Sequence, residues 1–203
     1  LPSGRAESVA LQPGKLSAAL GLTALTTRVR HPESCPEIGP ICAERAEPPQ
    51  QHDQRFYLAE LRPVVAVGIL EQLALEVQLP LRVVKSNITF RRLDGTAFEP
   101  DYENIHHRDE TLYGIADPWL LARSTVVLGP VALTGRAGVT LPLGSTEEDP
   151  FARARAGLSH QHIQFGSGTF QPLLALDAGL PLGRARLSGY AQAALFLYEN
   201  AHG

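Results

Sequence analysis

The feature that most constrains the fold of this chain is a strict alternation of apolar and polar side chains. Between Val131 and Gly144, every second residue is apolar or glycine, and the residues between them are small or polar with one arginine. Successive side chains of a β-strand point to opposite faces, so a period of two predicts a strand with one apolar face. The alternation predicts seven such strands. They are Lys15–Arg28, Tyr57–Ile69, Leu73–Val83, Pro118–Leu128, Val131–Gly144, Phe170–Leu182 and Arg184–Tyr198.

The predicted strands are long. They run over about 11–14 residues, whereas strands of soluble sandwiches have about 5–6 and a tilted strand needs about 9–11 to cross a bilayer. This length favours contact of the apolar rows with lipid. Proline removes a donor from the hydrogen-bond ladder, so we expect the prolines of these segments near strand ends or bulges. They are Pro63, Pro80, Pro142, Pro172 and Pro181.

Short and long connections alternate along the chain. The short ones are at about Leu70–Gln72, at Gly129-Pro130 and at Gly183. The long ones are at about His31–Gln54, Arg91–Glu110 and Ser145–Gly168. Outer-membrane barrels have short periplasmic turns and longer outer loops, so the alternation predicts an up-and-down barrel with its long loops at one end. Many aromatic residues fall near these long-loop ends, as in the aromatic girdle of a membrane barrel.

Composition excludes several other classes of protein. The 18 Lys+Arg against 21 Asp+Glu residues give a net charge of −3, which excludes the basic surface of a nucleic-acid-binding protein. No window approaches about 18 consecutive apolar residues, so no transmembrane helix is expected. The chain begins at Leu1 and contains no Met, which indicates a processed or excised chain, and we expect that a signal peptide has been removed.

We therefore predict an all-β fold, an antiparallel up-and-down transmembrane β-barrel with at least seven strands. Residues 1–203 are expected to form a single barrel domain, with residues 1–14 as an N-terminal tail. Bacterial single-chain barrels have even strand numbers, so we expect about 8–12 strands in the complete protein and one or more missing C-terminal strands. Residues Glu199–Gly203 accordingly read as the start of another outer loop.

If the apolar rows face lipid, the alternate rows face the lumen. The candidate lumen-lining residues are Glu60, Arg62, Glu76, Gln78, Arg82, Arg123, Arg136, Gln171, Asp177 and Gln192. Both signs of charge are present, so these side chains can pair across strands, as charges in an enclosed space must. They fit a structural ion-pair network that fills a narrow barrel, and they equally fit a polar lining that selects what passes through.

The predicted loops supply the remaining candidates. Cys35 and Cys42 lie in the first long loop and are predicted to form a local disulfide. Four loop histidines are weak candidates for a metal site, because imidazole binds Zn and Cu, but no metal or other cofactor is predicted. They are His106, His107, His160 and His162. No nucleophile elbow of the GxSxG type occurs, so no catalytic residue and no enzymatic activity are expected.

Three short motifs in the second half of the chain suggest a family. They are Gly114-Ile115-Ala116-Asp117, Thr140-Leu141-Pro142-Leu143-Gly144 and Gly166-Ser167-Gly168-Thr169. In these motifs, and over about residues 113–200, the chain resembles outer-membrane transport proteins of the "meta-pathway of phenol degradation" family. Ala116 and Leu143 depart from the Gly and Thr typical of that family. The resemblance implies an outer-membrane barrel that handles small hydrophobic or aromatic compounds, and it brings no catalytic residue with it.

Periodicity and resemblance together predict a porin-like barrel in the bacterial outer membrane that passes or binds such compounds. Its expected partners are the lipid bilayer of the outer membrane and a small-molecule solute, with no nucleic acid, and the oligomeric state is left open. Two alternatives stay open: a structural or adhesive outer-membrane barrel with a plugged lumen, and a soluble β-sandwich or lipocalin-like binding module. An outer-membrane hydrolase is the enzymatic alternative.

Overall fold

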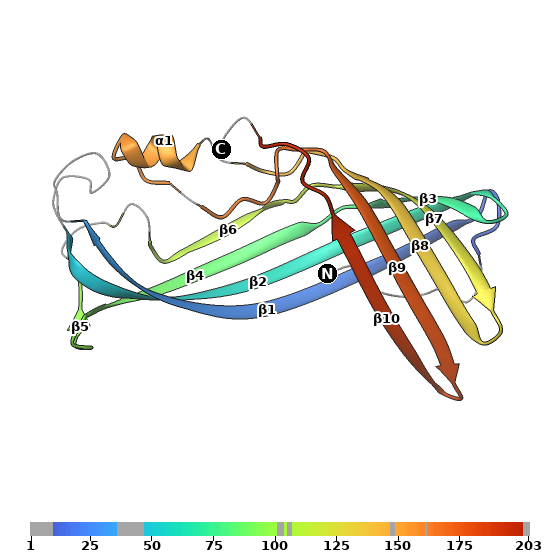
Figure 1. Ribbon diagram of the computed structural model, residues 1–203, viewed down its shortest axis with the longest axis horizontal. Helices are drawn as coiled ribbons and strands as arrows, with labels where there is room; N and C mark the ends of the chain where they lie inside the picture. Colours follow the sequence, from blue (N-terminus) through green and yellow to red (C-terminus); the bar gives the residue numbers. More distant parts are fainter. Residues whose placement is uncertain are drawn as a thin grey trace.

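One antiparallel sheet dominates the computed structural model, which describes residues 10–35, 47–100, 104, 107–146, 149–160 and 162–200 (Figure 1). The strands are β1 (Leu16–Cys35), β2 (Glu47–Leu70), β3 (Leu73–Gln78), β4 (Leu81–Arg92), β5 (Ala97–Phe98), β6 (Glu110–Ile115), β7 (Trp119–Leu128), β8 (Val131–Thr140), β9 (Gln171–Leu182) and β10 (Ala185–Ala194). A short helix, α1 (Pro150–Arg155), lies between β8 and β9. The predicted all-β antiparallel fold is therefore confirmed.

The ten strands correspond to seven passes of the chain. β3 and β4 both pair with β2 and are separated only by Leu79-Pro80, so they form one interrupted pass. β6 and β7 pair with β4 and β3 in the same way, across a break at residues 116–118. β5 pairs only with the end of β4 among the described strands. Each of the seven predicted segments falls on one of these passes, but β6 and the part of β4 after Val83 were not predicted. Each pass pairs with its sequence neighbour.

The first two passes extend much further than predicted. β1 has 20 residues and β2 has 24, so most of the expected first loop at His31–Gln54 is strand instead. That expectation was wrong because this stretch carries polar residues on both faces, and period two reveals a strand only where one face is apolar. The other long connections fall where they were expected, and the last contains α1, whose first turn is capped by Asp149 accepting from the Phe151 N–H at 2.9 Å.

Prolines mark the places where the passes are interrupted. At each of three breaks a proline carbonyl accepts a hydrogen bond from a backbone N–H of the neighbouring pass. The donors are Leu79 to Pro63, Ala116 to Pro80 and Leu141 to Pro118. Pro63 lies where β2 changes partner from β4, which it pairs with up to Leu61, to β3, which it pairs with from Val64. The missing N–H groups therefore fall at breaks, where no ladder bond is lost. Pro142, Pro172 and Pro181 lie just after or near the ends of β8 and β9, as expected.

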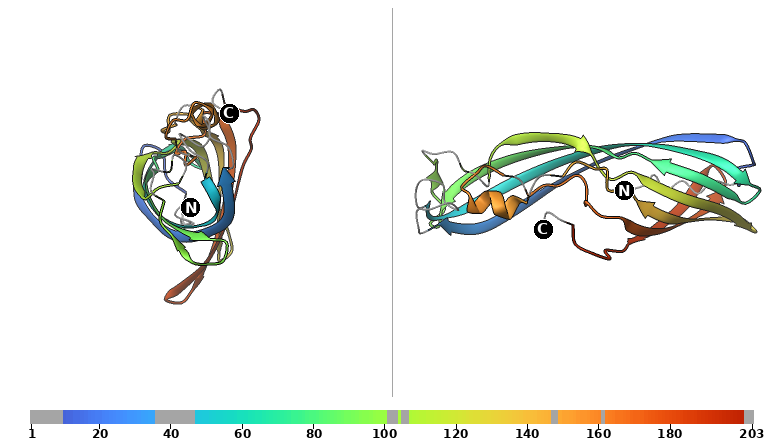
Figure 2. Two further views of the ribbon diagram at one scale, coloured as in Figure 1. Left: turned by 90° about the vertical axis from the view of Figure 1, so that its left-hand side faces the viewer. Right: turned by 90° about the horizontal axis from the view of Figure 1, so that it is seen from above.

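The sheet is strongly curled and carries its apolar side chains on the outside. Viewed along the long axis, the strands wrap around a trough (Figure 2). In β3 the exposed residues are Leu73, Leu75 and Val77, and the buried ones are Ala74, Glu76 and Gln78. Among the described residues, 10 hydrophobic side chains are buried, 6 of them alanine, against 19 polar or charged ones. We call the buried, polar side of the sheet the concave face.

The sheet does not close into a barrel within the described residues. There, β1 pairs only with β2 and β10 only with β9, so each leaves one edge open. Since seven antiparallel passes place the first and last in the same direction, these two edges cannot join in an antiparallel ladder. The described strands also form one sheet and not two, so no second sheet covers the apolar rows as in a sandwich. No helix in the described part of the chain is long and apolar enough to cross a membrane.

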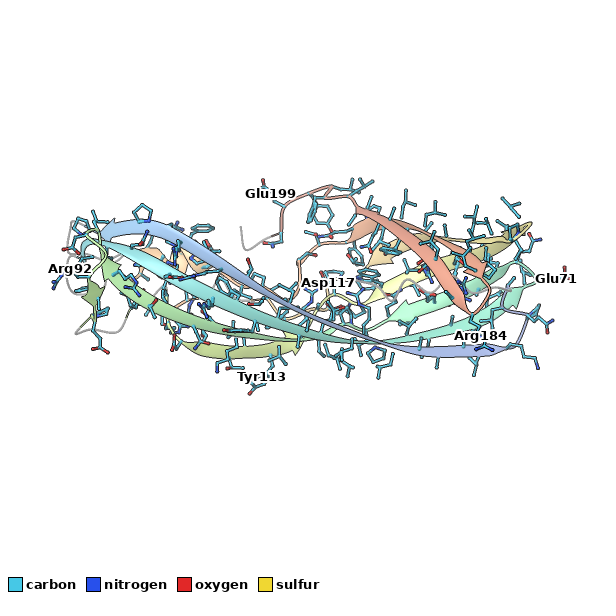
Figure 3. The ribbon with its side chains drawn as sticks, turned by 90° about the horizontal axis from the view of Figure 1, so that it is seen from below. Glu71, Arg92, Tyr113, Asp117, Arg184 and Glu199 are labelled. Atoms are coloured by element: carbon cyan, nitrogen blue, oxygen red, sulfur yellow. The ribbon has the colours of Figure 1, made fainter. Side chains whose placement is uncertain are left out.

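The two ends of the molecule differ in their connections. The β2–β3 and β9–β10 turns, which hold Glu71 and Arg184, lie at one end, and Arg92 lies at the opposite end with the long connections (Figure 3). We call these the short-turn end and the long-loop end. Gly183 has a φ of 61° and Gly129 a φ of 59°, left-handed conformations that glycine adopts without strain. The predicted separation of short and long connections is thus present.

Candidate functional site

Glu76 of β3 is the centre of a buried charge network on the concave face. Its Oε1 accepts from Arg136 Nε of β8 at 2.8 Å, and its Oε2 accepts from Arg123 Nη1 of β7 at 3.3 Å. Arg136 also forms an ion pair with Asp177 of β9. The side chains of Glu76 and Asp177 are each 1% exposed. Four neighbouring strands therefore contribute to one connected set of charges.

A glutamine links this set to a second carboxylate. Gln78 Nε2 donates to Glu76 Oε1 at 2.7 Å, and Gln78 Oε1 accepts from Arg62 Nη1 at 3.2 Å. Arg62 in turn pairs with Glu60, its neighbour on the same face of β2, at 2.7 Å. Glu60 also accepts from Arg82 Nε of β4 at 2.7 Å. The chain of contacts thus crosses the sheet without interruption from β4 to β9.

We call these eight residues the cross-sheet network. They are Arg82, Glu60, Arg62, Gln78, Glu76, Arg123, Arg136 and Asp177. Four arginines face three carboxylates, so the network carries one excess positive charge when all are ionised. Burying charges is costly unless each is paired and hydrogen-bonded, and this arrangement provides a partner for every charge. All eight residues are among the ten that the sequence predicts to share this face.

The other two predicted lining residues lie at the margins of the network. Gln171 is buried at the start of β9, where its backbone N–H donates to Thr140 Oγ1 at 3.2 Å. Gln192 is directly opposite Ala175, a buried residue of the concave face, but it is exposed because β10 is an edge strand. Its Oε1 accepts from the Tyr190 hydroxyl.

A small apolar cluster shares the concave face, and the sequence did not indicate it. Trp119, Leu121, Leu173 and Ala175 are buried together, with Tyr190 packed against them. The guanidinium of Arg62 lies 4.1 Å from the centre of the Trp119 ring, a cation–π contact that favours the buried charge. Trp119 therefore belongs to the interior and not to an outer aromatic girdle. The alternation in Pro118–Leu128 could have revealed it, because Trp119 and Arg123 have the same parity.

A second ion cluster lies on the opposite face, near the long-loop end. Asp53 of β2 accepts from Arg28 Nε at 2.5 Å and from Arg30 Nε at 3.0 Å. These bonds, first that from Arg28 and then that from Arg30, lower the pKa of Asp53 to about 2. Both arginines belong to β1, and Arg30 is the direct cross-strand partner of Asp53. This cluster fixes the β1–β2 hairpin beyond the apolar rows.

The predicted loop histidines do not form one group. His107 lies with His31 and His52, two residues that the sequence did not mark as metal candidates. His160 contacts His162, with ring centres 5.0 Å apart, and its Nδ1 is 2.9 Å from the Leu158 carbonyl oxygen. His106 lies outside the described residues. The meeting of His31 with His52 depends on strand register, which the alternation alone does not give.

The three motifs that carry the family resemblance meet around Asp117. The carboxylate of Asp117 accepts from the Gly144 N–H at 2.9 Å through Oδ1, and from the Ser167 N–H at 2.7 Å through Oδ2. A Cβ on Gly144 would lie 2.6 Å from Gly166 Cα, and one on Gly166 would lie 2.6 Å from the Gly144 carbonyl oxygen. The two glycines are therefore required for the close approach of the two chain segments.

The predicted disulfide is not tested by the structure, because Cys42 and the side chain of Cys35 lie outside the described residues. Comparison of the chain with models of protein families, with curated protein sequences and with solved structures finds no match.

Proposed function

We propose that this chain forms the wall of an outer-membrane β-barrel that passes or binds small hydrophobic or aromatic compounds. The observation that carries the proposal is the inverted distribution of side chains, with leucine and valine rows exposed and a charged network buried. A soluble protein buries its large apolar side chains, whereas a membrane barrel turns them to lipid and its polar side chains inward.

The length of the apolar surface supports a membrane span. On the outward face of β2 every residue from Tyr57 to Ile69 is apolar, whereas Arg55 and Asp53 continue the same row with charges. This row spans 12 residue steps, or about 40 Å at about 3.3 Å per residue. A strand tilted by about 45° converts this into a height of about 28 Å, close to the apolar band of a bilayer.

Towards the long-loop end, the apolar surface stops at one row of cross-strand partners. Thr26, Tyr57, Lys85 and Thr111 are successive cross-strand partners on β1, β2, β4 and β6. On β1, β2, β4 and β6 the outward residues on the short-turn side of this row are apolar, and the next outward partners on the other side, Arg28 and Arg55, are charged. Tyrosine and lysine are residues typical of the membrane interface, and Tyr113, close to this row, points away from the sheet (Figure 3).

The long-loop end then extends beyond the bilayer. β1 and β2 continue past this row through the Arg28, Arg30 and Asp53 cluster. In outer-membrane barrels the longer loops face outward, so this extension is the extracellular part. The proposed cargo rests on the family resemblance of the sequence alone.

A structural or adhesive barrel with a plugged lumen is the second candidate, and the cross-sheet network favours it. Arg62 and Arg123 are only 2% and 4% exposed, so this part of the concave face is filled by paired side chains. A transporter would need these contacts to open or to leave a path beside them.

The experiment is to express the chain with an export signal, locate it by cell fractionation, and reconstitute the purified protein in vesicles. We expect recovery in the outer-membrane fraction, a need for detergent, and solute flux in liposome swelling. Insertion without flux would select the plugged barrel over the transporter. If the protein is monodisperse in buffer without detergent, both membrane barrels are refuted, and the soluble binding module becomes the favoured function.

A further inference from the structure

Three histidines that the proposed function does not use meet near the long-loop end. His31 of β1 and His52 of β2 are direct cross-strand partners, and His107 joins them from the segment before β6. Their ligand nitrogens all lie within 4.8 Å of one another. The ring centres are 5.2 Å apart for His31 and His52, 5.3 Å for His31 and His107, and 4.7 Å for His52 and His107.

The surrounding structure holds these imidazoles in place. The β1–β2 ladder sets the backbones of His31 and His52 opposite each other, and the His52 side chain is fully buried. Phe90, the partner of His52 on β4, packs its ring edge-to-face at 5.0 Å. The backbone N–H of His107 donates to Oδ1 of the buried Asn104 at 2.8 Å. Two strands and the anchored backbone of His107 thus present the three rings to one point.

The distances suit a metal ion. With metal–nitrogen bonds of about 2.0–2.1 Å, tetrahedral zinc places its ligand nitrogens about 3.3 Å apart, so the rings need to close by at most about 1.5 Å. Rotation of the His31 and His107 side chains, which are only partly buried, can supply a movement of this size while the buried His52 stays in place. Three nitrogen ligands leave a fourth position for water, as in His₃ zinc sites.

The nearby charges leave room for a cation. Arg28 and Arg30 are on the opposite face of the β1–β2 hairpin, where both bind Asp53. On the histidine face the residue packed on His52 from β4 is the neutral Phe90. Arg92 is two residues further along β4, and its guanidinium carbon lies over the ring of Phe98, 5.7 Å from the ring centre.

We propose that His31, His52 and His107 form a binding site for a borderline-soft divalent transition-metal ion, Zn²⁺ being the ion that fits best. Imidazole ligands favour Zn²⁺, Cu²⁺ and Ni²⁺, and disfavour Mg²⁺ and Ca²⁺, which take oxygen ligands. Bound metal would tie the loop before β6 to the first hairpin and so stiffen the long-loop end.

The test is calorimetric titration of the untagged full chain with ZnCl₂, and with MgCl₂ as the control ion. We expect one Zn²⁺ per chain, no heat from Mg²⁺, and ligand-field absorption from Co²⁺ bound at the same site. His107→Ala, which changes a loop and leaves the sheet intact, should weaken Zn²⁺ binding at least tenfold, and His52→Ala should do the same.

The matched control is His162→Ala, which removes an exposed histidine from the other histidine pair. It should leave Zn²⁺ affinity unchanged. Failure of the wild-type chain to bind Zn²⁺ would overturn the proposal, as would equal losses for His162→Ala and His107→Ala. Neither result depends on whether the protein conducts solute, so the metal site and the proposed function fail independently.

Discussion

Replacing Glu76 by glutamine should destabilise the protein by about 3 kcal/mol. Glu76 is 1% exposed and accepts hydrogen bonds from Arg123 and Arg136. Hydrogen bonds to charged groups contribute about 1.5–3 kcal/mol each, and breaking a buried ion pair costs about 3–5 kcal/mol because the remaining charge stays buried. Arg136 keeps its pair with Asp177, so the loss falls mainly on Arg123 and lies at the lower end of that range.

The assay is urea unfolding of the protein in detergent micelles, followed by fluorescence of Trp119, the one tryptophan of the chain. Its contact with Arg62, which Gln78 links to Glu76, makes it a reporter for the network. The matched control is Glu71→Gln in the exposed β2–β3 turn, which should change the unfolding free energy by less than about 0.5 kcal/mol.

A double variant separates the lost ion pair from a general packing defect. Glu76→Gln combined with Arg123→Met removes both charges of the pair, and should recover part of the stability that Glu76→Gln loses. The reasoning is refuted if Glu76→Gln behaves like Glu71→Gln, or if the losses of the two single variants simply add.

Three further predictions address other parts of the molecule. Gly144→Ala should destabilise the protein by about 1–3 kcal/mol through overpacking against Gly166 and Asp117, whereas Gly135→Ala, whose added Cβ meets nothing within 4 Å, should be neutral in the same unfolding assay; equal effects would contradict the proposed junction. Asp53 has a pKa of about 2, lowered by Arg28 and Arg30, against about 3.9 in an unfolded chain, so its ionised form adds stability above about pH 4 that is lost as the pH falls toward 2. Asp53→Asn should flatten the dependence of the unfolding midpoint on pH in that window, and an unchanged profile would contradict the ion cluster. In vesicles, Leu20→Arg should destabilise the inserted protein by about 2–4 kcal/mol, because Leu20 is exposed and pairs with Pro63 at the middle of the apolar row, and Gln72→Arg, in the short turn, by about 0–1 kcal/mol; equal tolerance of both would contradict a lipid-facing Leu20.

The sequence was sufficient to predict which face of the sheet each side chain points to. It was not sufficient to predict which side chains from other strands it contacts there. Alternation assigns Glu76 and Arg136 to one face because side-chain direction is a local property of an extended chain. Their contact joins residues 60 positions apart and depends on the register of three strands, which the alternation leaves undetermined. The same limit hid the meeting of His31 with His52.

Strand ends were predictable only where one face is apolar. Leu73–Leu79 alternates cleanly and the strand was found, whereas the ends of β1 and β2 carry charges such as Arg28 and Asp53 on one face and histidines on the other. These ends are extended because they pair with neighbouring strands, and not because of an apolar alternation in their own sequence. The role of Asp117 in joining the three motifs could not be predicted either, because the two residues that donate to it, Gly144 and Ser167, lie 27 and 50 positions away in the sequence.

The central claim is tested most directly by a nitroxide scan of residues 73–78 in lipid vesicles, in a background where both cysteines are replaced by serine. Oxygen concentrates in lipid, and a water-soluble nickel complex stays outside it. The account predicts that labels at Leu73, Leu75 and Val77 collide mainly with oxygen and that those at Ala74, Glu76 and Gln78 do not, with a period of two. Labels at Leu75 and Val77 that collide with the nickel complex, or with neither reagent, would contradict it.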